Sequence, residues 1–246
     1  MIPLLLSLLL SLPAASAQDT GAERITSMHV DIRHQHSGRT RIREEIAYDF
    51  GSAEKHGITR FIPLGNYPHR LGFTLGDVTA DGTKAVYQEA MKDRVQNLRI
   101  GDANHTITGA HTYVISYVLE NNVVFKNDGE SFAWNAIGTN WAVPIEKASA
   151  DLVVEKPDGS PIDPKTLDVH AACYTGSQGE TGSDCTHTAA AESVHFETTR
   201  TLAAGEGMTV QTQLSAGTTI PPSFAVTLRN NVIASGRLLL HILALL

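Results

Sequence analysis

Two tryptophans and their polar neighbours are the residues best suited to hold a ligand. They are the only tryptophans in this chain of 246 residues, and both lie in FAWNAIGTNWAVPI (132–145). Indole faces stack on sugars and indole N–H groups donate hydrogen bonds, so this stretch could line a carbohydrate or peptide cleft. The candidate ligand residues here are Glu130, Trp134, Asn135 and Trp141. The alternative is structural: a strand, a tight turn at Gly138 and a second strand, with both indoles filling a core.

Arg60, in HGITRFIP, is the fifth candidate ligand residue. A guanidinium can clamp an anionic ligand through two parallel hydrogen bonds. It can equally form an internal ion pair, and Glu44, Glu45 or Glu130 could supply the carboxylate. Because Ile58 and Ile62 flank Arg60 in a strand-like pattern, the internal pair is the favoured interpretation.

His34 and His36 are candidate metal ligands, because residues two apart on a strand face the same side. A third ligand would have to come from His29, His56 or His111. A His-x-His pair is common without a metal, so no metal site and no cofactor are expected.

Cys173 and Cys185 bound the glycine-rich stretch CYTGSQGETGSDC and are the only cysteines. An even number of cysteines at close spacing in an exported protein predicts a disulfide. A metal site would need a C-x-x-C pair and further ligands, which the sequence lacks.

Enzyme motifs are nearly absent. The sequence contains no G-x-S-x-G, no H-E-x-x-H and no phosphate-binding loop. SAEK (52–55) matches S-x-x-K, but glycines flank it in an expected loop and the companion motifs are missing. The chain is therefore expected not to be an enzyme, with no catalytic residue.

The two ends of the chain suggest export and a membrane. Ile2–Leu12 is apolar and Ala15-Ser16-Ala17 follows it, which predicts a signal peptide over residues 1–17; an uncleaved anchor is the alternative. At the other end, residues 229–246 finish on LLLHILALL. Nine helical residues rise about 14 Å, less than half of a ~30 Å bilayer core. The tail is interpreted as the start of a truncated transmembrane helix, or else as a short docking helix.

Between these ends, residues 18–228 read as strands and turns. Met28, Val30 and Ile32 alternate before a Ser-Gly turn, and further alternating runs include HTYVISYVLE (111–120) and GMTVQTQL (207–214). Asp81-Gly82 predicts a two-residue hairpin turn. Short strands separated by turns, with little helical periodicity, predict an all-β fold, a β-sandwich of immunoglobulin-like or related antiparallel type. The net charge of −7 without a basic cluster argues against nucleic-acid binding.

Several stretches in fixed order carry a family resemblance. They are KHGITRFIPL (55–64), LRIGD (98–102), GAHTYVISYVL (109–119) and FAWNAIGTNWAVPIEKASADLVVEKP (132–157). The matching positions are Gly57, Ile58, Arg60, Ile62, Pro63, Ile100, Gly101, Thr112, Tyr113, Ile115, Tyr117, Trp134, Asn135, Gly138, Trp141, Val143, Pro144 and Ile145. Over about residues 24–220 the chain resembles the N-terminal domain of the domain of unknown function 2207 family, predicted bacterial membrane proteins (YciQ-like).

The resemblance implies a signal peptide, an extracytoplasmic β-rich domain at the periplasm or cell surface, and transmembrane helices after it. This chain stops where the first of those helices should begin. The leading hypothesis is a non-enzymatic binding or assembly module of the cell envelope. Its partner would be another envelope protein or its own membrane-embedded portion, with strand addition at an exposed sheet edge as one mode. The alternative is a carbohydrate- or peptide-binding or processing domain that uses Trp134, Trp141 and Arg60.

Overall fold

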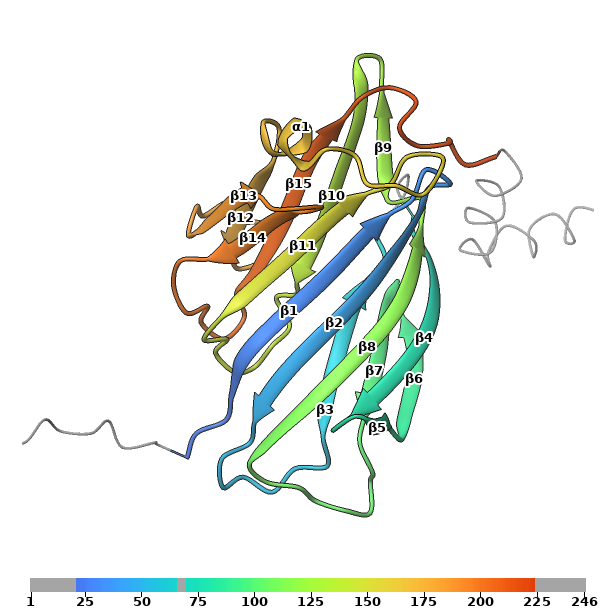
Figure 1. The fold of residues 1–246 in the computed structure, drawn as a ribbon. Coiled ribbons are helices and arrows are strands. Elements are labelled where there is room, and N and C mark those ends of the chain that lie inside the picture. Colours follow the sequence, from blue (N-terminus) through green and yellow to red (C-terminus); the bar gives the residue numbers. More distant parts are fainter. Residues whose placement is uncertain (1–20, 66–69, 224–246) are drawn as a thin grey trace, which may run out of the picture.

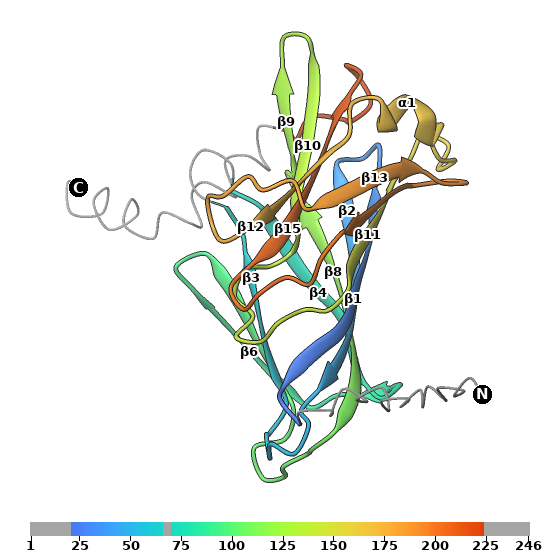
Figure 2. The same ribbon diagram turned by 90° about the vertical axis from the view of Figure 1, so that its left-hand side faces the viewer.

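The protein is an all-β sandwich, as the alternating sequence predicts. The computed structural model describes residues 21–65 and 70–223, so the predicted signal segment and apolar tail lie outside the described residues. One eight-stranded sheet forms the first layer, and two smaller sheets lie against the same face of it (Figures 1 and 2). Within the described ranges, no helix has the length and apolar character needed to cross a bilayer.

The large sheet has mixed topology. Its strands, in sheet order, are β13 (Cys185–Ala189), β14 (Val194–Thr198), β11 (Ala148–Val154), β1 (Arg24–His34), β2 (Arg39–Asp49), β8 (Ala110–Glu120), β4 (Gly72–Ala80) and β5 (Thr83–Lys84). The β1–β11 pair is parallel, and the other named pairs of this sheet are antiparallel. β1 and β2 form a hairpin at the Ser-Gly turn, and β8, which contains the alternating run 111–120, pairs with β2 on one side and β4 on the other.

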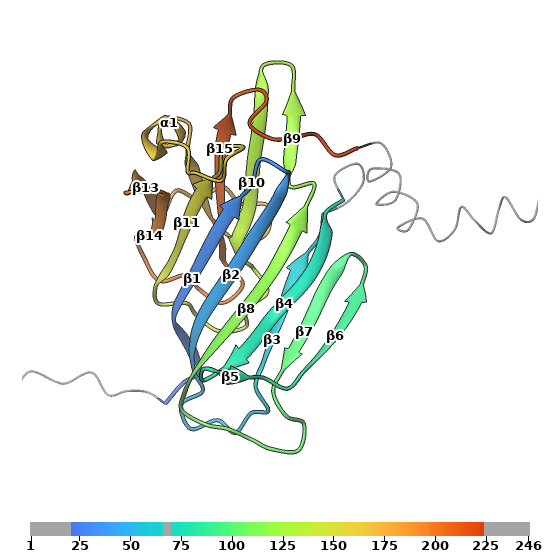
Figure 3. The same cartoon turned by 45° about the vertical axis from the view of Figure 1, so that its right-hand side comes forward.

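The second layer consists of two sheets that Figure 3 separates clearly. The four-stranded sheet has the order β12 (Ala172–Gly176), β15 (Gly207–Leu214), β10 (Gly129–Ile137) and β9 (Val123–Lys126). The three-stranded sheet has the order β3 (Ile58–Pro63), β7 (Val95–Ile100) and β6 (Tyr87–Lys92). One short helix, α1 (Pro164–Asp168), is capped by Asp163, whose side chain accepts a hydrogen bond from the Lys165 amide.

Turn chemistry explains where several strands end. Asp81 and Gly82 both have positive φ, 50° and 74°, as a type I′ hairpin turn requires. The predicted hairpin forms, but its second strand, β5, is short, because the chain continues after Lys84 into β6 of the three-stranded sheet. The strand expected directly after Gly138 is absent: residues 138–147 are a connection, and β11 begins at Ala148. Pro144 lacks an amide donor, and Ile145 makes only isolated bridges, to Ile25 and Leu202.

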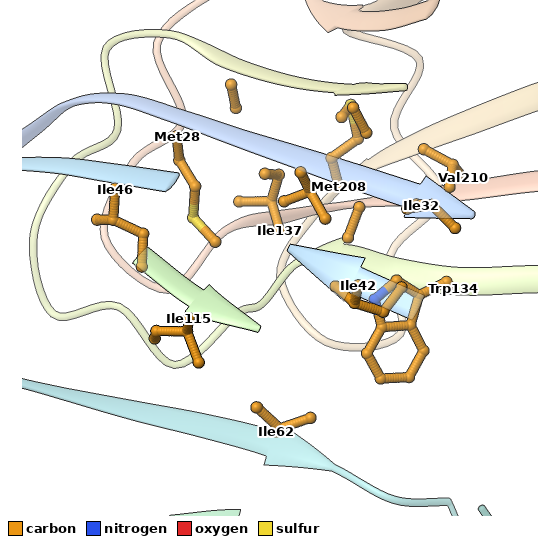
Figure 4. Close-up of a cluster of buried hydrophobic side chains, with 14 of the residues drawn as sticks. Met28, Ile32, Ile42, Ile46, Ile62, Ile115, Trp134, Ile137, Met208 and Val210 are labelled. Atoms are coloured by element: carbon orange, nitrogen blue, oxygen red, sulfur yellow. The ribbon is translucent and has the colours of Figure 1, made fainter. Parts of the chain in front are cut away.

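Side chains from all three sheets meet in one core. On β2 the alternate residues Thr40, Ile42, Glu44, Ile46 and Tyr48 are buried, while Arg41, Arg43 and Glu45 face solvent. Figure 4 shows the centre of this core, where Ile42, Ile46 and Ile115 of the large sheet face Ile62 and Trp134 of the second layer. The core therefore contains polar side chains as well as aliphatic ones. Three of the buried polar residues, His34, Arg60 and Glu130, are candidate site residues from the sequence.

Candidate functional site

Arg60 lies in the core, on β3, and forms an ion pair with Glu44 of β2. Its Nε donates to Glu44 Oε2 and its Nη2 to Glu44 Oε1, each at 2.7 Å. Nη1 donates to the carbonyl of Phe61 at 2.5 Å. The side chains are 2% and 0% exposed, so both charges are withdrawn from water. Of the three carboxylates that the sequence offered, Glu44 is the partner.

Tyr117 of β8 completes this buried network. Its hydroxyl donates to Glu44 Oε1 at 2.6 Å. Burial and the Glu44 carboxylate raise the pKa of the Tyr117 hydroxyl well above its usual value. Burial opposes the charge on Arg60, but the Glu44 carboxylate outweighs this effect and raises the pKa of the guanidinium. The group is an ion pair with a neutral tyrosine donor, and it joins the two layers of the sandwich.

Trp141 and Gly138 enclose the other side of the guanidinium. The Arg60 Cζ lies 5.9 Å from the centroid of the Trp141 ring, within range of a cation–π contact. A Cβ atom on Gly138 would lie 2.5 Å from Arg60 Nη1, closer than real contacts allow. The glycine is thus required by the approach of Arg60, and not by a positive φ at a tight turn.

Both indoles are buried. Trp141 is 5% exposed and Trp134, on β10, is 6% exposed. Trp134 lies edge-on to the Tyr117 ring, with 6.4 Å between centroids, and packs in the cluster of Figure 4. Neither ring presents a face to solvent on which a sugar could stack. This is the arrangement that the structural alternative predicts, although the ligand-binding role itself stays a prediction.

Glu130 and Asn135 serve other contacts on β10. Glu130 is 2% exposed, and its Oε1 accepts hydrogen bonds from the amides of Gly217 and Thr219 at 2.9 and 3.2 Å. Glu130 lies four positions before Trp134 on the strand, a distance of about 13 Å. The Asn135 side-chain amide, oriented with its nitrogen toward the backbone, donates to the carbonyls of Ile137 and Met208. The five candidates therefore do not line one cleft. Arg60, Trp134 and Trp141 meet around the Glu44–Tyr117 network, whereas Glu130 and Asn135 form hydrogen bonds with backbone groups.

The predicted metal ligands His34 and His36 bind the same segment as Glu130. His34 is fully buried at the end of β1, with Nδ1 2.9 Å from Thr40 Oγ1 and Nε2 2.9 Å from Thr219 Oγ1. His36 Nδ1 lies 2.7 Å from the Thr218 carbonyl. Burial lowers the pKa of His34 to about 4, although Glu155 acts in the opposite direction. Both nitrogens of His34 are occupied by hydroxyl groups, so the neutral imidazole acts here as a hydrogen-bonding bridge.

Among the described residues, the one group of three or more metal-ligating side chains lies elsewhere. It consists of His29, Asp31 and Asp151, on the outer face of the large sheet. The alternation of β1 places His29 and Asp31 on one face, and this signal was present in the sequence. The sequence does not indicate that Asp151 joins them, because Asp151 lies 120 residues after Asp31 and is its neighbour only through the parallel β1–β11 pairing.

The predicted disulfide is present. Cys173 on β12 is bonded to Cys185 on β13, with 6.2 Å between their Cα atoms. Because β12 belongs to the four-stranded sheet and β13 to the large sheet, the bond fastens the two layers together.

A cleft of about 380 Å³ lies at the end of the sandwich where the described chain finishes. The β1–β2 turn, the β8–β9 connection and the segment after β15 form its walls. Its main lining residues are Arg39, Asn121, Val123, Phe125, Ile220 and Pro221. Phe125 and Ile220 are 39% and 52% exposed, so this cleft has an apolar rim open to solvent.

Comparisons with solved structures find remote similarities. Native leukotriene A4 hydrolase from Saccharomyces cerevisiae is 11% identical, with a TM-score of 0.49; the match covers 77% of this chain and 29% of that one. An M1 zinc metallopeptidase from Deinococcus radiodurans is 7% identical, with a TM-score of 0.41 and coverage of 76% and 42%. A putative protease from Parabacteroides distasonis is 12% identical, with a TM-score of 0.41 and coverage of 77% and 40%. The chain thus spans under half the length of these proteins, and the similarity carries no inference about activity. No curated protein matches the chain.

The sequence match to a family is broad by contrast. Residues 24–214, which include every strand of the sandwich, match the family described as "Predicted membrane protein (DUF2207) N-terminal domain". Arg60, Tyr117, Trp134, Gly138 and Trp141, five of the positions on which the sequence resemblance rests, lie together around the buried ion pair. The chain belongs to the DUF2207 family, described as predicted membrane proteins, and its residues 24–214 correspond to the N-terminal domain of that family.

Proposed function

We propose that this domain is a non-enzymatic, extracytoplasmic binding or assembly module of the cell envelope, whose partner is the membrane-embedded portion of its own protein. The observation that carries the proposal is the burial of the residues most suited to chemistry. Arg60, Glu130, Trp134 and Trp141 are each at most 6% exposed. Their contacts hold sheets and segments together and leave the indole faces closed to a saccharide or peptide.

The apolar cleft supports a docking role at one end of the sandwich. Phe125 and Val124 lie on β9, an edge strand, and Ile220 lies near the point where the described chain ends. Ser223, the last residue that the structure describes, also lines this cleft. The family description, an N-terminal domain of a membrane protein, supports a partner that follows in sequence.

Site-specific photocrosslinking tests this proposal. A photoreactive phenylalanine analogue replaces Phe125 in the natural full-length protein, produced in its envelope. We expect crosslinks from position 125 into the membrane-embedded portion. The same analogue at Val169, which is 77% exposed on the connection after α1, is the matched control and should give no such product. Equal crosslinking from both positions, or none from position 125, would contradict the proposal.

Tryptophan fluorescence tests the scaffold role separately. Two buried indoles should emit at short wavelength, and the emission should not move when oligosaccharides or peptides are added. Emission typical of water-exposed indole that shifts with added glycan would instead support the carbohydrate-binding alternative. Unfolded protein in urea supplies the reference for exposed emission.

A further inference from the structure

The outer face of the large sheet carries a compact group of metal-ligating atoms far from the buried network. His29 Nε2 lies 3.4 Å from Asp31 Oδ1 and 3.4 Å from Asp151 Oδ2. One ligand atom of each residue lies within 4.8 Å of the others. His29 and Asp31 are two apart on β1, and Asp31 faces Asp151 in the parallel β1–β11 register. Backbone pairing, and not a flexible loop, holds the three side chains together.

The other polar atom of each side chain has its own hydrogen-bond partner. His29 Nδ1 lies 2.8 Å from Ser149 Oγ. Asp151 Oδ1 accepts from Ser193 Oγ at 3.2 Å and lies 3.0 Å from His195 Nδ1. These contacts use Nδ1 of His29 and Oδ1 of Asp151, and the remaining atoms, His29 Nε2 and Asp151 Oδ2, lie 3.4 Å apart. Partners of this kind orient the ligands in protein metal sites.

Asp31 shows the same arrangement. Its Oδ2 lies 3.4 Å from Arg43 Nη1, while its Oδ1 faces His29. Arg43 is itself held by Glu45, with 2.7 Å between Nη2 and Oε2. The group and its immediate surroundings therefore keep a net negative charge, which favours a cation.

We propose that His29, Asp31 and Asp151 form a binding site for a divalent transition-metal ion of the zinc type. Zinc–nitrogen and zinc–oxygen bonds are about 2.0–2.2 Å, which sets neighbouring ligand atoms of a tetrahedron about 3.4 Å apart. The two separations from His29 Nε2 match that spacing. Three protein ligands leave a fourth position open to water or to a small anionic ligand.

The ligand types determine which ions fit. An imidazole together with two carboxylates suits zinc and its transition-metal neighbours, whereas magnesium and calcium prefer oxygen ligands alone. A bound ion would join β1 to β11, the one parallel pair of the large sheet, and would reach β14 through His195. This site departs from the expectation of no metal, and it uses none of the residues of the proposed docking cleft.

Metal titration tests the site. Tag-free protein with its disulfide intact is stripped with EDTA, dialysed and titrated with Zn²⁺ by calorimetry and with Co²⁺ by visible absorption. We expect one ion per chain, with Co²⁺ absorption typical of four-coordination and no displacement by a hundredfold excess of Mg²⁺. His29→Gln and Asp151→Asn should each weaken Zn²⁺ binding by at least about tenfold, and Ser149→Ala by about 10- to 100-fold, as loss of an orienting partner does.

His187→Gln is the matched control. His187 pairs with one carboxylate, Asp168, at 2.9 Å, and belongs to no three-ligand group in the described ranges. Its removal should leave Zn²⁺ affinity unchanged. Circular dichroism of each metal-free variant confirms the fold before titration, and Asp31→Asn, at a half-exposed position, repeats the test if another variant misfolds. Equal affinity in His29→Gln and the unchanged protein, or no binding at 1 mM Zn²⁺, would overturn the proposal.

Discussion

Arg60 and Glu44 meet in the middle of the sandwich through two hydrogen bonds of 2.7 Å, one from Nε and one from Nη2. The residues come from opposite layers, since Glu44 lies on β2 of the large sheet and Arg60 on β3 of the three-stranded sheet. Such a pair contributes little net stability over an apolar pair, but removing one partner leaves a charge buried alone. A different fit of the two layers would separate these residues and leave both charges buried without a partner.

The first prediction follows from this burial. Glu44→Gln should lower the free energy of unfolding by about 3–5 kcal/mol, because Arg60 then lacks its counter-charge in the core. Urea unfolding measures the effect. Glu45→Gln is the control, since the neighbouring Glu45 faces solvent and pairs with exposed Arg43. An exposed pair is worth at most about 1 kcal/mol. Equal losses in the two variants would contradict the buried-pair interpretation.

Gly138→Ala should also destabilise the protein, by about 1–3 kcal/mol, because the new methyl group would overlap Arg60 Nη1. The effect should depend on the arginine. In a background that carries both Arg60→Met and Glu44→Leu, the guanidinium is gone and most of the cost of Gly138→Ala should disappear. A double-mutant cycle from urea unfolding measures this coupling. A cost that is the same in both backgrounds would mean that the glycine is needed for another reason.

The local features of the sequence predicted much of this fold. Alternation predicted β1, β8 and β15, and Asp81-Gly82 predicted a turn. The same alternation placed Glu44 on the face of Ile42 and Ile46, which was enough to favour it over Glu45 as the partner of Arg60. The cysteine spacing predicted the disulfide, since short separation alone makes the pairing plausible.

Pairings between distant strands could not be predicted in this way. Nothing near Asp31 in the sequence indicates that β1 pairs in parallel with β11, so the sequence alone does not bring Asp151 to His29 and Asp31. The prediction of a strand directly after Gly138 was wrong for a related reason. Trp141 and Ile145 have the spacing of strand residues, but they do not lie on a strand. Trp141 packs against Arg60, and Ile145 makes isolated backbone bridges to Ile25 and Leu202.

The disulfide gives a third prediction. Replacing Cys173 and Cys185 together with serine should lower the free energy of unfolding by about 3 kcal/mol, the value for a closed loop of roughly this length. Reduction of the unchanged protein should produce the same loss, which controls for effects of the serines. Both are measured by urea unfolding. Two titratable thiols in the oxidised, denatured protein would show that the bond does not form.

His34 gives a prediction about pH. Its pKa is about 4 in the folded protein and 6.5 is the ordinary value, so the unfolded chain binds a proton more readily. The stability from neutral His34 is therefore fully present above about pH 6.5 and is lost as the pH falls toward 4. The difference corresponds to about 3 kcal/mol across that window.

His34→Gln isolates this contribution. Glutamine can bond both Thr40 and Thr219 but does not titrate, so the variant should lose less stability than the unchanged protein between pH 7.5 and pH 4.5. Carboxylates that titrate in both proteins cancel in the comparison. The segment 217–219 adds a local readout, because His34 and Glu130 both fasten it. Its amides should exchange faster at low pH in the unchanged protein alone. Parallel stability curves for the two proteins would show that His34 is not held neutral by the core.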